Sequence, residues 1–324
     1  MQHLELSFPS ANTDLLGLVE QATRFLEAAK APATRKAYAA DLSDYRAFCA
    51  RIGQPMFAPG GEVLALYVAD LASGGKKPST ISRRVAAIAT QYRASGYGET
   101  PASSFLVKEI LQGVRRTLGI AQERKSPLLI ADIERIVASS PERLIGLRDR
   151  ALVLLGFACG CRRAELAAIE IRDLELTSEG LILTVRRGKT DQEQQGRQVP
   201  MAFGIHPETC PVRASAAWIE AAGIVEGPVF RSVDRHGNLS SQPLDPGSIA
   251  RILKKAARRA GMDKEEAAKI AGHSLRSGTA TAAAIAGASE REIAGLTGHR
   301  SREVKRYIRD ANLFRSSAAG RLGL

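Results

Sequence analysis

The sequence His273-Ser274-Leu275-Arg276 is followed along the chain by Thr297-Gly298-His299-Arg300-Ser301 and then by Lys305-Arg306-Tyr307-Ile308-Arg309. In a helix, side chains three residues apart lie on one face, so the imidazole of His273 and the guanidinium of Arg276 would reach the same point in space. Such a pair suits a phosphate group. The phenol oxygen of Tyr307 could attack phosphorus while the cations hold the phosphate oxygens, and a site of this kind requires no metal ion.

Each of these motifs also has a plain structural interpretation when it is taken alone. His-x-x-Arg occurs by chance in many helices. Tyr307 shares an apolar stripe with Val304, Ile308 and Ala311, a spacing typical of a buried helix face. A core tyrosine is therefore the simpler interpretation of these residues alone, and the functional hypothesis depends on residues elsewhere in the chain.

The size and charge of the chain favour a globular two-domain protein with a polyanionic partner. Its 324 residues suffice for two domains, and 46 Lys and Arg against 34 Asp and Glu give a formal net charge of +12. Nucleic acid is the partner that this charge favours most. A membrane is disfavoured because the basic residues accompany no face rich in Trp or Phe, and because the longest apolar run, 151–161, is too short to span a bilayer.

The cysteines and the N-terminal residues indicate where the protein works. The four cysteines form no Cys-x-x-Cys pair and are too few to staple a chain of this length, which fits a reducing compartment. Residues 1–10 show no basic start and no apolar run, so we expect no secretory signal and a cytoplasmic, nucleoid-associated protein. His206 and Cys210 would be only two ligands, so we expect no metal and no cofactor.

The first third of the chain predicts a compact bundle of four helices without strands. Amphipathic periodicity indicates helices over 34–52, 61–72, from 79 onward and over about 104–118. The periodicity stops in a polar segment after Gly119. We therefore predict an N-terminal DNA-binding domain over 1–118, a linker over 119–127 and a catalytic domain with a C-terminal tail over 128–324.

The second domain is predicted to be mainly helical with one small antiparallel sheet. Helices are expected from about 131 and over 144–158, 211–222 and 249–260. A capping box at 289–292 starts a further short helix that ends before Gly298. Residues 181–187 are typical of a strand and 197–201 of the returning strand, with Lys189 on the polar turn that joins them.

Two sets of basic side chains are candidates for contact with a DNA backbone. The first is Lys76, Lys77, Arg83 and Arg84, with both arginines expected to face outward. The second lies on one face of the predicted helix over 249–260 and consists of Arg251, Lys254, Lys255, Arg258 and Arg259. The second set has no acidic residue at pairing distance, so its members repel one another unless a polyanion lies against them. We predict DNA contact there, whereas for the first set a solvated face and a DNA-binding face are equally open.

Taken together in chain order, the motifs resemble those of the tyrosine recombinases of the phage integrase family, and most of all its Cre-type branch. They are the segment 159–166, Gly188-Lys189-Thr190, His273-x-x-Arg276, Gly298-His299 and Tyr307. The resemblance covers nearly the whole chain. It implies a mainly α fold, in which an N-terminal helical core-binding domain precedes an α+β catalytic domain with a small antiparallel sheet.

The resemblance also implies a role for each matching residue. The two arginines, the hairpin lysine, the two histidines and the nucleophile would be Arg162, Arg276, Lys189, His273, His299 and Tyr307, and the carboxylate that supports the first arginine would be Glu165. The chain departs from the family pattern in two places. Cys161 stands where leucine is common, which we expect to affect only packing, and the spacing from the second histidine to the tyrosine is one residue shorter than usual.

The implied reaction breaks and rejoins a phosphodiester without metal or ATP. Arg162 and Arg276 would neutralise the non-bridging oxygens with paired donors, and Lys189 would protonate the leaving oxygen as a general acid. Attack by Tyr307 would give a covalent 3′-phosphotyrosine that conserves the bond energy for resealing. The two histidines could accept the tyrosine proton, bond a phosphoryl oxygen or align the tyrosine, and the sequence leaves that division open.

Site-specific recombination of double-stranded DNA that carries a specific recombination site is the function favoured here. Exchange of two duplexes requires four cleavages and each chain has one Tyr307, so we expect a tetramer on DNA in which the tail over 311–324 docks on a neighbour. Two alternatives stay open. One is a type IB topoisomerase-like enzyme that cuts and reseals one duplex. The other is a non-catalytic DNA-binding regulator, suggested by the helix-turn-helix-like spacing of Ala283, Gly287 and Ile293.

Overall fold

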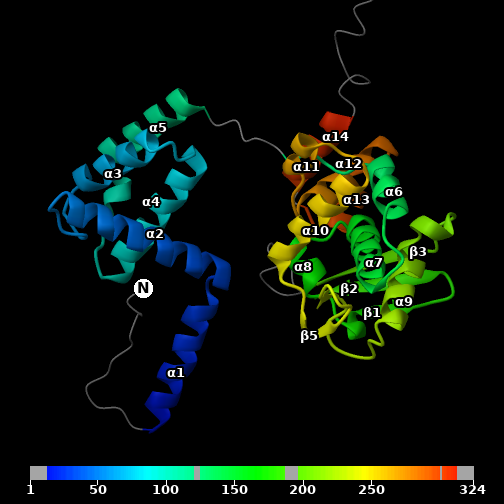
Figure 1. Cartoon of the computed structure of the whole chain (residues 1–324). Coiled ribbons are helices and arrows are strands. Elements are labelled where there is room, and N and C mark those ends of the chain that lie inside the picture. The colour runs from blue at the N-terminus through cyan, green and yellow to red at the C-terminus, as the bar shows by residue number, and fades with distance from the viewer. Residues whose placement is uncertain (1–12, 120–124, 187–195, 300, 312–324) are drawn as a thin grey trace, which may run out of the picture. The chain divides into compact units, whose positions relative to one another are not determined.

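The structure, a computed structural model, describes residues 13–119, 125–186, 196–299 and 301–311 (Figure 1). The chain divides into two compact units, Met1–Gln122 and Glu123–Leu324, and the cut falls inside the segment predicted as a linker. No helix in the described part of the chain is long and apolar enough to cross a membrane.

The first unit is built from helices whose starts are encoded locally. These helices are α1 (Thr13–Ala28), α2 (Pro32–Arg51), α3 (Glu62–Ser73), α4 (Pro78–Ala94), the 3-10 helix η1 (Pro101–Ser103) and α5 (Phe105–Leu118). Proline is the first residue of both α2 and α4, where its missing N–H costs no hydrogen bond. Ser104 caps α5 by accepting a hydrogen bond from the backbone N–H of Val107, at 3.3 Å.

An aromatic cluster forms the centre of this first unit. The ring of Tyr67 lies 5.0 Å from that of Tyr45 and 5.1 Å from that of Phe48, centroid to centroid, and all three side chains are buried. The four helices expected from periodicity are confirmed as α2 to α5, and the described residues of this unit contain no strand. Helix α1 was not predicted, and several of its apolar side chains, Phe25 among them, are exposed.

The expectation that Arg84 faces outward is wrong. Its side chain is 13% exposed and its guanidinium pairs with Asp44, lies 3.6 Å from Asp41 and donates to the hydroxyl of Tyr67 at 2.8 Å. Arg83 also pairs with Asp41, although it stays exposed. Periodicity placed both arginines on the polar face of α4, but it did not show that two carboxylates of α2 face them.

The second unit is organised around α7 (Leu144–Cys159), which is buried along most of its length. Helix α7 packs against α9 (Pro211–Ala221) and against α12 (Ser274–Ile285). Trp218 of α9 is fully buried, and its indole N–H donates to the carbonyl oxygen of Val229 at 2.9 Å. The helices predicted over 144–158 and 211–222 are thus confirmed.

Helices α13 (Glu290–Thr297) and α14 (Ser301–Ala311) pack against each other and against α12 (Figure 1). The predicted capping box starts α13, because the backbone N–H of Ser289 donates to Glu292 at 2.6 Å and the backbone N–H of Glu292 donates to Ser289 at 3.2 Å. The remaining helices of the unit are α6 (Ile130–Ala138), α8 (Arg163–Ala167), η2 (Ile171–Asp173), η3 (Pro207–Thr209), α10 (Pro246–Arg259) and α11 (Lys264–Lys269).

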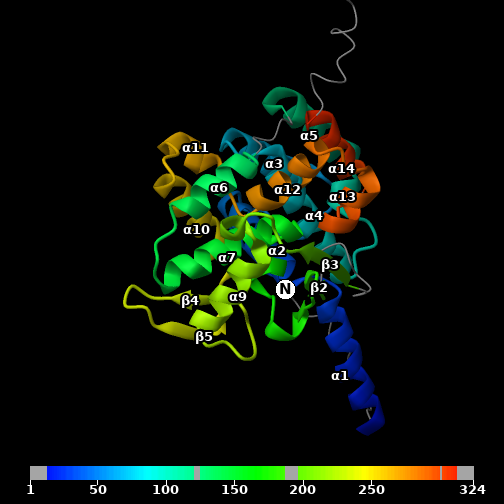
Figure 2. The ribbon, with the colours of Figure 1, turned by 90° about the vertical axis from the view of Figure 1, so that its right-hand side faces the viewer.

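Two small antiparallel sheets complete the second unit. Strands β1 (Leu174–Leu176), β2 (Gly180–Val185) and β3 (Arg197–Ala202) form one sheet in that order, and β4 (Arg231–Val233) pairs with β5 (Leu239–Pro243). In both views the β4–β5 pair lies at the far end of this unit from α14 (Figure 2). The predicted mainly helical fold with a small antiparallel sheet is confirmed, whereas β1, β4 and β5 were not predicted.

Residues just before α6 lie against the end of α11 and the start of α12. The backbone N–H of Ser126 donates to Lys269 O at 3.2 Å, and that of Leu128, which is buried, donates to Ser274 O at 3.1 Å. Gly278 of α12 permits this approach, because a Cβ there would lie 1.9 Å from the carbonyl oxygen of Leu128. The last residues of the predicted linker are therefore part of the second unit.

Candidate active site

The turn between α7 and α8 places Arg162 beside the end of α13. Gly160 ends α7 with a left-handed φ of +54°, and Arg162 is the N-cap residue of α8. A Cβ on Gly160 would lie 2.8 Å from the Cγ2 of Thr297, so only glycine allows this close approach. The Gly160 carbonyl oxygen in turn accepts a hydrogen bond from Nη1 of Arg276, at 2.8 Å.

Arg162 is held by the carboxylate of Glu165. Its Nη1 donates to Oε1 of Glu165 at 2.6 Å, and its backbone N–H donates to Oε2 at 3.0 Å. Its Nη2 donates to the carbonyl oxygen of Gly298 at 3.3 Å. The side chain of Glu165 is almost fully buried, so this charged hydrogen bond is shielded from water and fixes the guanidinium in direction.

Arg276 is completely buried and is the cation at the centre of the site. Its Nη1 donates to Gly160 O and Thr297 O, and its Nε donates to Nε2 of His299 at 3.0 Å. Its Nη2 is buried and has no hydrogen-bond partner among the described residues. Burial, and next the charge of Arg162, lowers the pKa of Arg276 to about 10, so the group stays protonated at neutral pH.

His299 is buried in one defined tautomer. Because the Nε of Arg276 can only donate, the Nε2 of His299 accepts, and the ring proton is on Nδ1. Nδ1 lies 2.8 Å from the Oγ1 of Thr297, and the Thr297 hydroxyl donates its own hydrogen bond to Ile293 O at 2.6 Å. Burial, and next the charge of Arg276, lowers the pKa of His299 to about 3, so this histidine is neutral at pH 7.

His273 and Tyr307 face each other across α12 and α14. His273 is the N-cap residue of α12, and its Nε2 lies 3.4 Å from the phenol oxygen of Tyr307. The Tyr307 ring is half-buried against Ala280 and its neighbours and lies 5.2 Å from the ring of His299, centroid to centroid. Burial, and next the charge of Arg276, lowers the pKa of His273, which favours the neutral ring, the form that can accept a proton.

The structure therefore brings together five of the six residues that the resemblance selects, together with Glu165. The sixth, Lys189, lies outside the described residues. Tyr307 packs on the apolar side of its helix, as expected of a core tyrosine, and it also lies next to His273 and His299.

The basic residues predicted to contact DNA differ in how far their side chains are exposed. Lys76, Lys77, Arg251, Lys254, Lys255 and Arg258 are exposed. Arg259 is half-buried and donates to the hydroxyl of Ser140 at 3.3 Å. Helix α10 thus keeps most of its predicted basic face available to a partner.

Arg197 belongs to this site and was not predicted. It is the first residue of β3, on the same face of the strand as the buried Val199 and Met201. Its Nη2 lies 3.3 Å from Oε2 of Glu165, and its Nε lies 3.3 Å from Leu296 O. The available signal was a charged residue at an inward position of an alternating strand.

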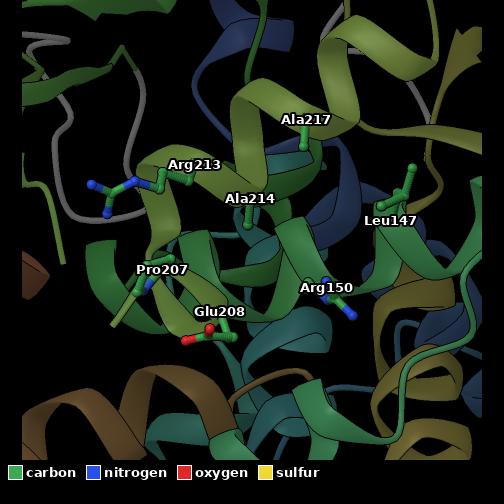
Figure 3. A pocket seen from close by; sticks show the side chains of 7 residues that line it. All are labelled: Leu147, Arg150, Pro207, Glu208, Arg213, Ala214 and Ala217. Atoms are coloured by element: carbon green, nitrogen blue, oxygen red, sulfur yellow. The ribbon is translucent and has the colours of Figure 1, made fainter. Parts of the chain in front are cut away.

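A small pocket of about 160 Å³ lies elsewhere in the second unit, between α7, η3 and α9 (Figure 3). It is lined by Leu147, Arg150, Pro207, Glu208, Arg213, Ala214 and Ala217, none of which belongs to the site described above. The candidate site is instead a cluster of one buried and two partly exposed guanidiniums near a half-buried phenol, an arrangement suited to an anionic group.

The comparison with known proteins agrees with this geometry. A model of the phage integrase family matches residues 128–313, which contain every site residue described above. The chain belongs to the phage integrase family.

This family member is similar over nearly its whole length to recombinases of bacteria. It is 38% identical to an integrase/recombinase XerD homolog of Selenomonas ruminantium, over 96% of this chain and 91% of that one. It is 28% identical to the tyrosine recombinase XerD of Caulobacter vibrioides, over 85% of this chain and 84% of the relative. Placement in the Cre-type branch stays a prediction, whereas the resemblance to tyrosine recombinases is confirmed.

Solved structures of the same fold include DNA complexes. The XerH site-specific recombinase bound to a palindromic difH substrate matches with a TM-score of 0.63 at 16% identity, over 96% of this chain and 84% of that one. A lambda integrase dimer bound to a COC′ core site matches with a TM-score of 0.59, also at 16% identity, over 94% of this chain and 83% of that one. At such identities the match concerns the fold alone.

Proposed function

We propose that this protein is a tyrosine site-specific recombinase that cuts and rejoins double-stranded DNA through a covalent 3′-phosphotyrosyl intermediate. The observation that carries the proposal is the buried Arg276, whose Nη2 has no hydrogen-bond partner within the part of the chain that the structure describes. Leaving a charged donor buried and unpartnered is costly, and a phosphate oxygen is the ligand that would satisfy it. Arg162 and Arg276 donate to the neighbouring carbonyl oxygens of Gly298 and Thr297, so both guanidiniums lie at one turn and could bind one phosphate.

In the proposed cleavage step the phenol oxygen of Tyr307 attacks the phosphorus. A bond forms between that oxygen and phosphorus, the bond to the 5′ oxygen of the leaving strand breaks, and Arg162 and Arg276 neutralise the non-bridging oxygens. The proton of Tyr307 goes to Nε2 of His273, which lies 3.4 Å away in the protein without DNA. Lys189 supplies the proton to the leaving 5′ oxygen. Attack by a free 5′ hydroxyl reverses these steps and reseals the strand.

The hydrogen bonds of the two histidines support different roles for them in this proposal. His299 uses its Nε2 to accept from Arg276, so that nitrogen is occupied, and its Nδ1 proton is held by Thr297. It is therefore better suited to orienting Arg276 and packing against the phenol than to removing a proton. The Nε2 of His273 faces the phenol, so His273 is the proposed general base.

We further propose that the two units act as DNA-binding and catalytic domains. The exposed cations of α10, with Lys76 and Lys77, would lie along the phosphate backbone of DNA. Clustered positive charges repel one another, and bound phosphates would offset that repulsion. The relatives are recombinases, and exchange of two duplexes needs four tyrosines, which supports a tetramer on DNA. Docking of the tail over 311–324 on a neighbour and residence in the cytoplasm belong to the same proposal.

Formation of a tyrosyl adduct is the direct test. Cognate DNA would be selected from a random duplex library by binding to the full-length protein, then nicked close to the cleavage position so that cutting releases a short fragment and traps the adduct. We expect a protein–DNA adduct whose linked peptide, after digestion, contains Tyr307 by mass. The matched control is Tyr307→Phe, which keeps the ring packing and removes the nucleophile.

The same experiment separates the alternatives. Tight binding to selected DNA without an adduct would favour the regulator. Adduct formation with resealing, but without strand exchange between two cognate duplexes, would favour topoisomerase-like activity.

A further inference from the structure

Arg197 lies where a charged side chain is unfavourable unless it is bound. Its side chain is 17% exposed, and it emerges from β3 on the face that buries Val199 and Met201. A mostly buried guanidinium is unfavourable without partners, so its hydrogen bonds determine what it does. Its hydrogen bonds to Glu165 and Leu296 both reach protein groups next to the proposed catalytic residues.

The first of these partners is the carboxylate that also holds Arg162. Glu165 receives Nη1 of Arg162 on Oε1 and Nη2 of Arg197 on Oε2, at 2.6 and 3.3 Å. The backbone N–H of Arg162 shares Oε2 at 3.0 Å. One buried carboxylate thus connects two guanidiniums, and its orientation depends on both of them.

The second contact of Arg197 is with the turn that carries His299. Its Nε donates to Leu296 O at 3.3 Å, near the end of α13. Gly298 follows with a left-handed φ of +64°, and a Cβ there would lie 3.2 Å from Nη1 of Arg197. The guanidinium of Arg197 therefore lies directly against the backbone of the residue before His299, while Arg162 bonds the Gly298 carbonyl oxygen.

We propose that Arg197 is a positioning residue for strand cleavage, which fixes the Glu165–Arg162 pair and the Gly298–His299 turn relative to each other. This inference rests on the proposed recombinase function. Arg197 is not assigned a contact with DNA, because two of its nitrogens are already directed at Glu165 and Leu296. Its loss should leave the site assembled loosely, with Arg162 and His299 misplaced by a fraction of an ångström to an ångström, which is enough to slow chemistry substantially.

A matched control exists beside the neighbouring strand. Arg186 follows β2 and pairs with Asp173 at 2.6 Å and with Glu170 at 3.3 Å, so it too is an arginine bound to carboxylates in the same sheet region. Neither carboxylate belongs to the candidate site. Substituting Arg186 removes an equivalent ion pair without touching Glu165 or the turn before His299.

The test compares full-length Arg197→Gln, Arg197→Lys and Arg186→Gln with the unmodified protein. DNA affinity is measured on selected cognate duplex, and the single-turnover rate of adduct formation is measured on the nicked duplex at saturating protein. For Arg197→Gln we expect a rate constant about 10- to 100-fold lower, as for other groups that orient catalytic residues, with the Kd changed less than threefold. Arg186→Gln should match the unmodified protein in both measurements.

Lysine tests whether the planar fork is required. A single ammonium cannot serve Glu165 and Leu296 with the geometry of a guanidinium, so Arg197→Lys should stay at least about tenfold slow in cleavage while it folds normally. It also keeps the inference testable if Arg197→Gln unfolds, which a thermal melt would reveal.

Two outcomes would overturn the inference. Unchanged cleavage in both Arg197 variants would remove the positioning role, and a loss confined to Kd would make Arg197 a DNA-binding residue. Absence of any adduct with the unmodified protein would instead count against the proposed function, so the two failures are distinguishable.

Discussion

Among single residues, Arg276 shows most directly how this protein prepares for a phosphate. A fully buried guanidinium is retained by two carbonyl oxygens and a histidine nitrogen, yet one of its nitrogens has no partner among the described residues. A site at rest that leaves a buried donor unsatisfied gives up stability. The loss is recovered when an anionic oxygen arrives, which makes the geometry of this residue more important than its charge alone.

Arg276→Lys is therefore expected to abolish most activity despite keeping the positive charge. Arg276 binds these acceptors through two separate nitrogens, Nε and Nη1, and keeps Nη2 for the phosphate. The three N–H donors of a lysine ammonium leave from one nitrogen, so they cannot reproduce these positions and keep a further donor for the phosphate. The rate of adduct formation at saturating DNA should fall by about 10²- to 10³-fold, with a much smaller change in Kd. A variant that cleaves within threefold of the unmodified protein would contradict this assignment.

His299 provides a prediction about protonation. With a pKa lowered to about 3 by burial and by Arg276, its ring should remain neutral from pH 7 down to about pH 4, with the proton on Nδ1. Long-range ¹H–¹⁵N NMR spectra of the histidine rings should show that tautomer throughout. Because the unfolded chain takes up a proton below its ordinary pKa of 6.5 and the folded site does not, His299 costs stability as the pH falls from 6.5 toward 3.

The control for this titration is Thr297→Val, which removes the acceptor of the Nδ1 proton and keeps the shape of the side chain. The tautomer should then become mixed, or the bond from Arg276 should be lost. If the spectra instead showed a ring that protonates near pH 6.5, the hydrogen-bond arrangement around His299 would be different from that described.

At the level of secondary-structure elements, α14 decides where the nucleophile points. Val304 of α14 is fully buried, and Tyr307 follows three residues later on the same stripe. The helix begins at Ser301 and α13 ends at Thr297, so the shorter spacing between His299 and Tyr307 is compatible with a short turn rather than with a distorted helix.

Inserting one alanine between Arg306 and Tyr307 should abolish adduct formation. The insertion turns everything beyond it by about 100° and moves it by about 1.5 Å, so the phenol leaves His273 while the Val304 anchor stays in place. The matched control is one alanine between Arg309 and Asp310, which lengthens the helix without moving Tyr307. Equal loss in both insertions would show that α14 tolerates no change of length, and the aim of the phenol would not be the cause.

The elements that the sequence predicted are those with several turns of periodicity or a recognisable cap. Helices α2 to α5, α9, α10 and α13 have apolar stripes and local starts or stops, α7 is a long apolar run that ends before Gly160, and β2 with β3 alternates clearly. Strands β1 and β4 have three residues each, too few to establish a period of two. Helix α1 was not predicted, and much of its apolar surface is exposed in the structure.

The sequence predicted those residues of the candidate site that belong to family motifs. Arg162, His273, Arg276, His299 and Tyr307 stand in recognisable short patterns, so order and spacing selected them. Arg197 stands in none, because its role depends on β3 lying against the ends of α8 and α13, a tertiary fact. The burial of Arg84 escaped prediction for the same reason, since its carboxylate partners lie on a different helix.

For the whole molecule, charge should govern affinity more than specificity. The exposed cations of α10 form a row on a helix whose opposite side, including Leu253 and Ala257, is buried in the core. A row of this kind fits the sugar–phosphate backbone, whose binding releases condensed counterions and falls steeply with salt.

Lys254→Gln with Lys255→Gln should weaken binding to cognate and to unrelated DNA by a similar factor. It should also lower the slope of log affinity against log salt by about two, because each lysine that no longer reaches a phosphate lowers it by about one. The control is Lys264→Gln with Lys269→Gln on α11, which removes the same charge from a different helix. Loss of cognate binding alone, with unrelated DNA bound as before, would mean that these lysines recognise bases.

The attachment of Ser126 to the end of α11 and of Leu128 to α12 bears on how chimaeric recombinases should be assembled. Ser126 and Leu128 each contribute a backbone hydrogen bond to the second unit, and Gly278 leaves room for the Leu128 carbonyl. The part of the chain that matches the family begins at residue 128. A crossover placed there would take Ser126 from one parent and α12, the helix that carries Arg276, from the other. A crossover at or before Lys125 keeps both sides of this contact from the same parent, and such hybrids should retain the catalytic rate of the donor of the second unit.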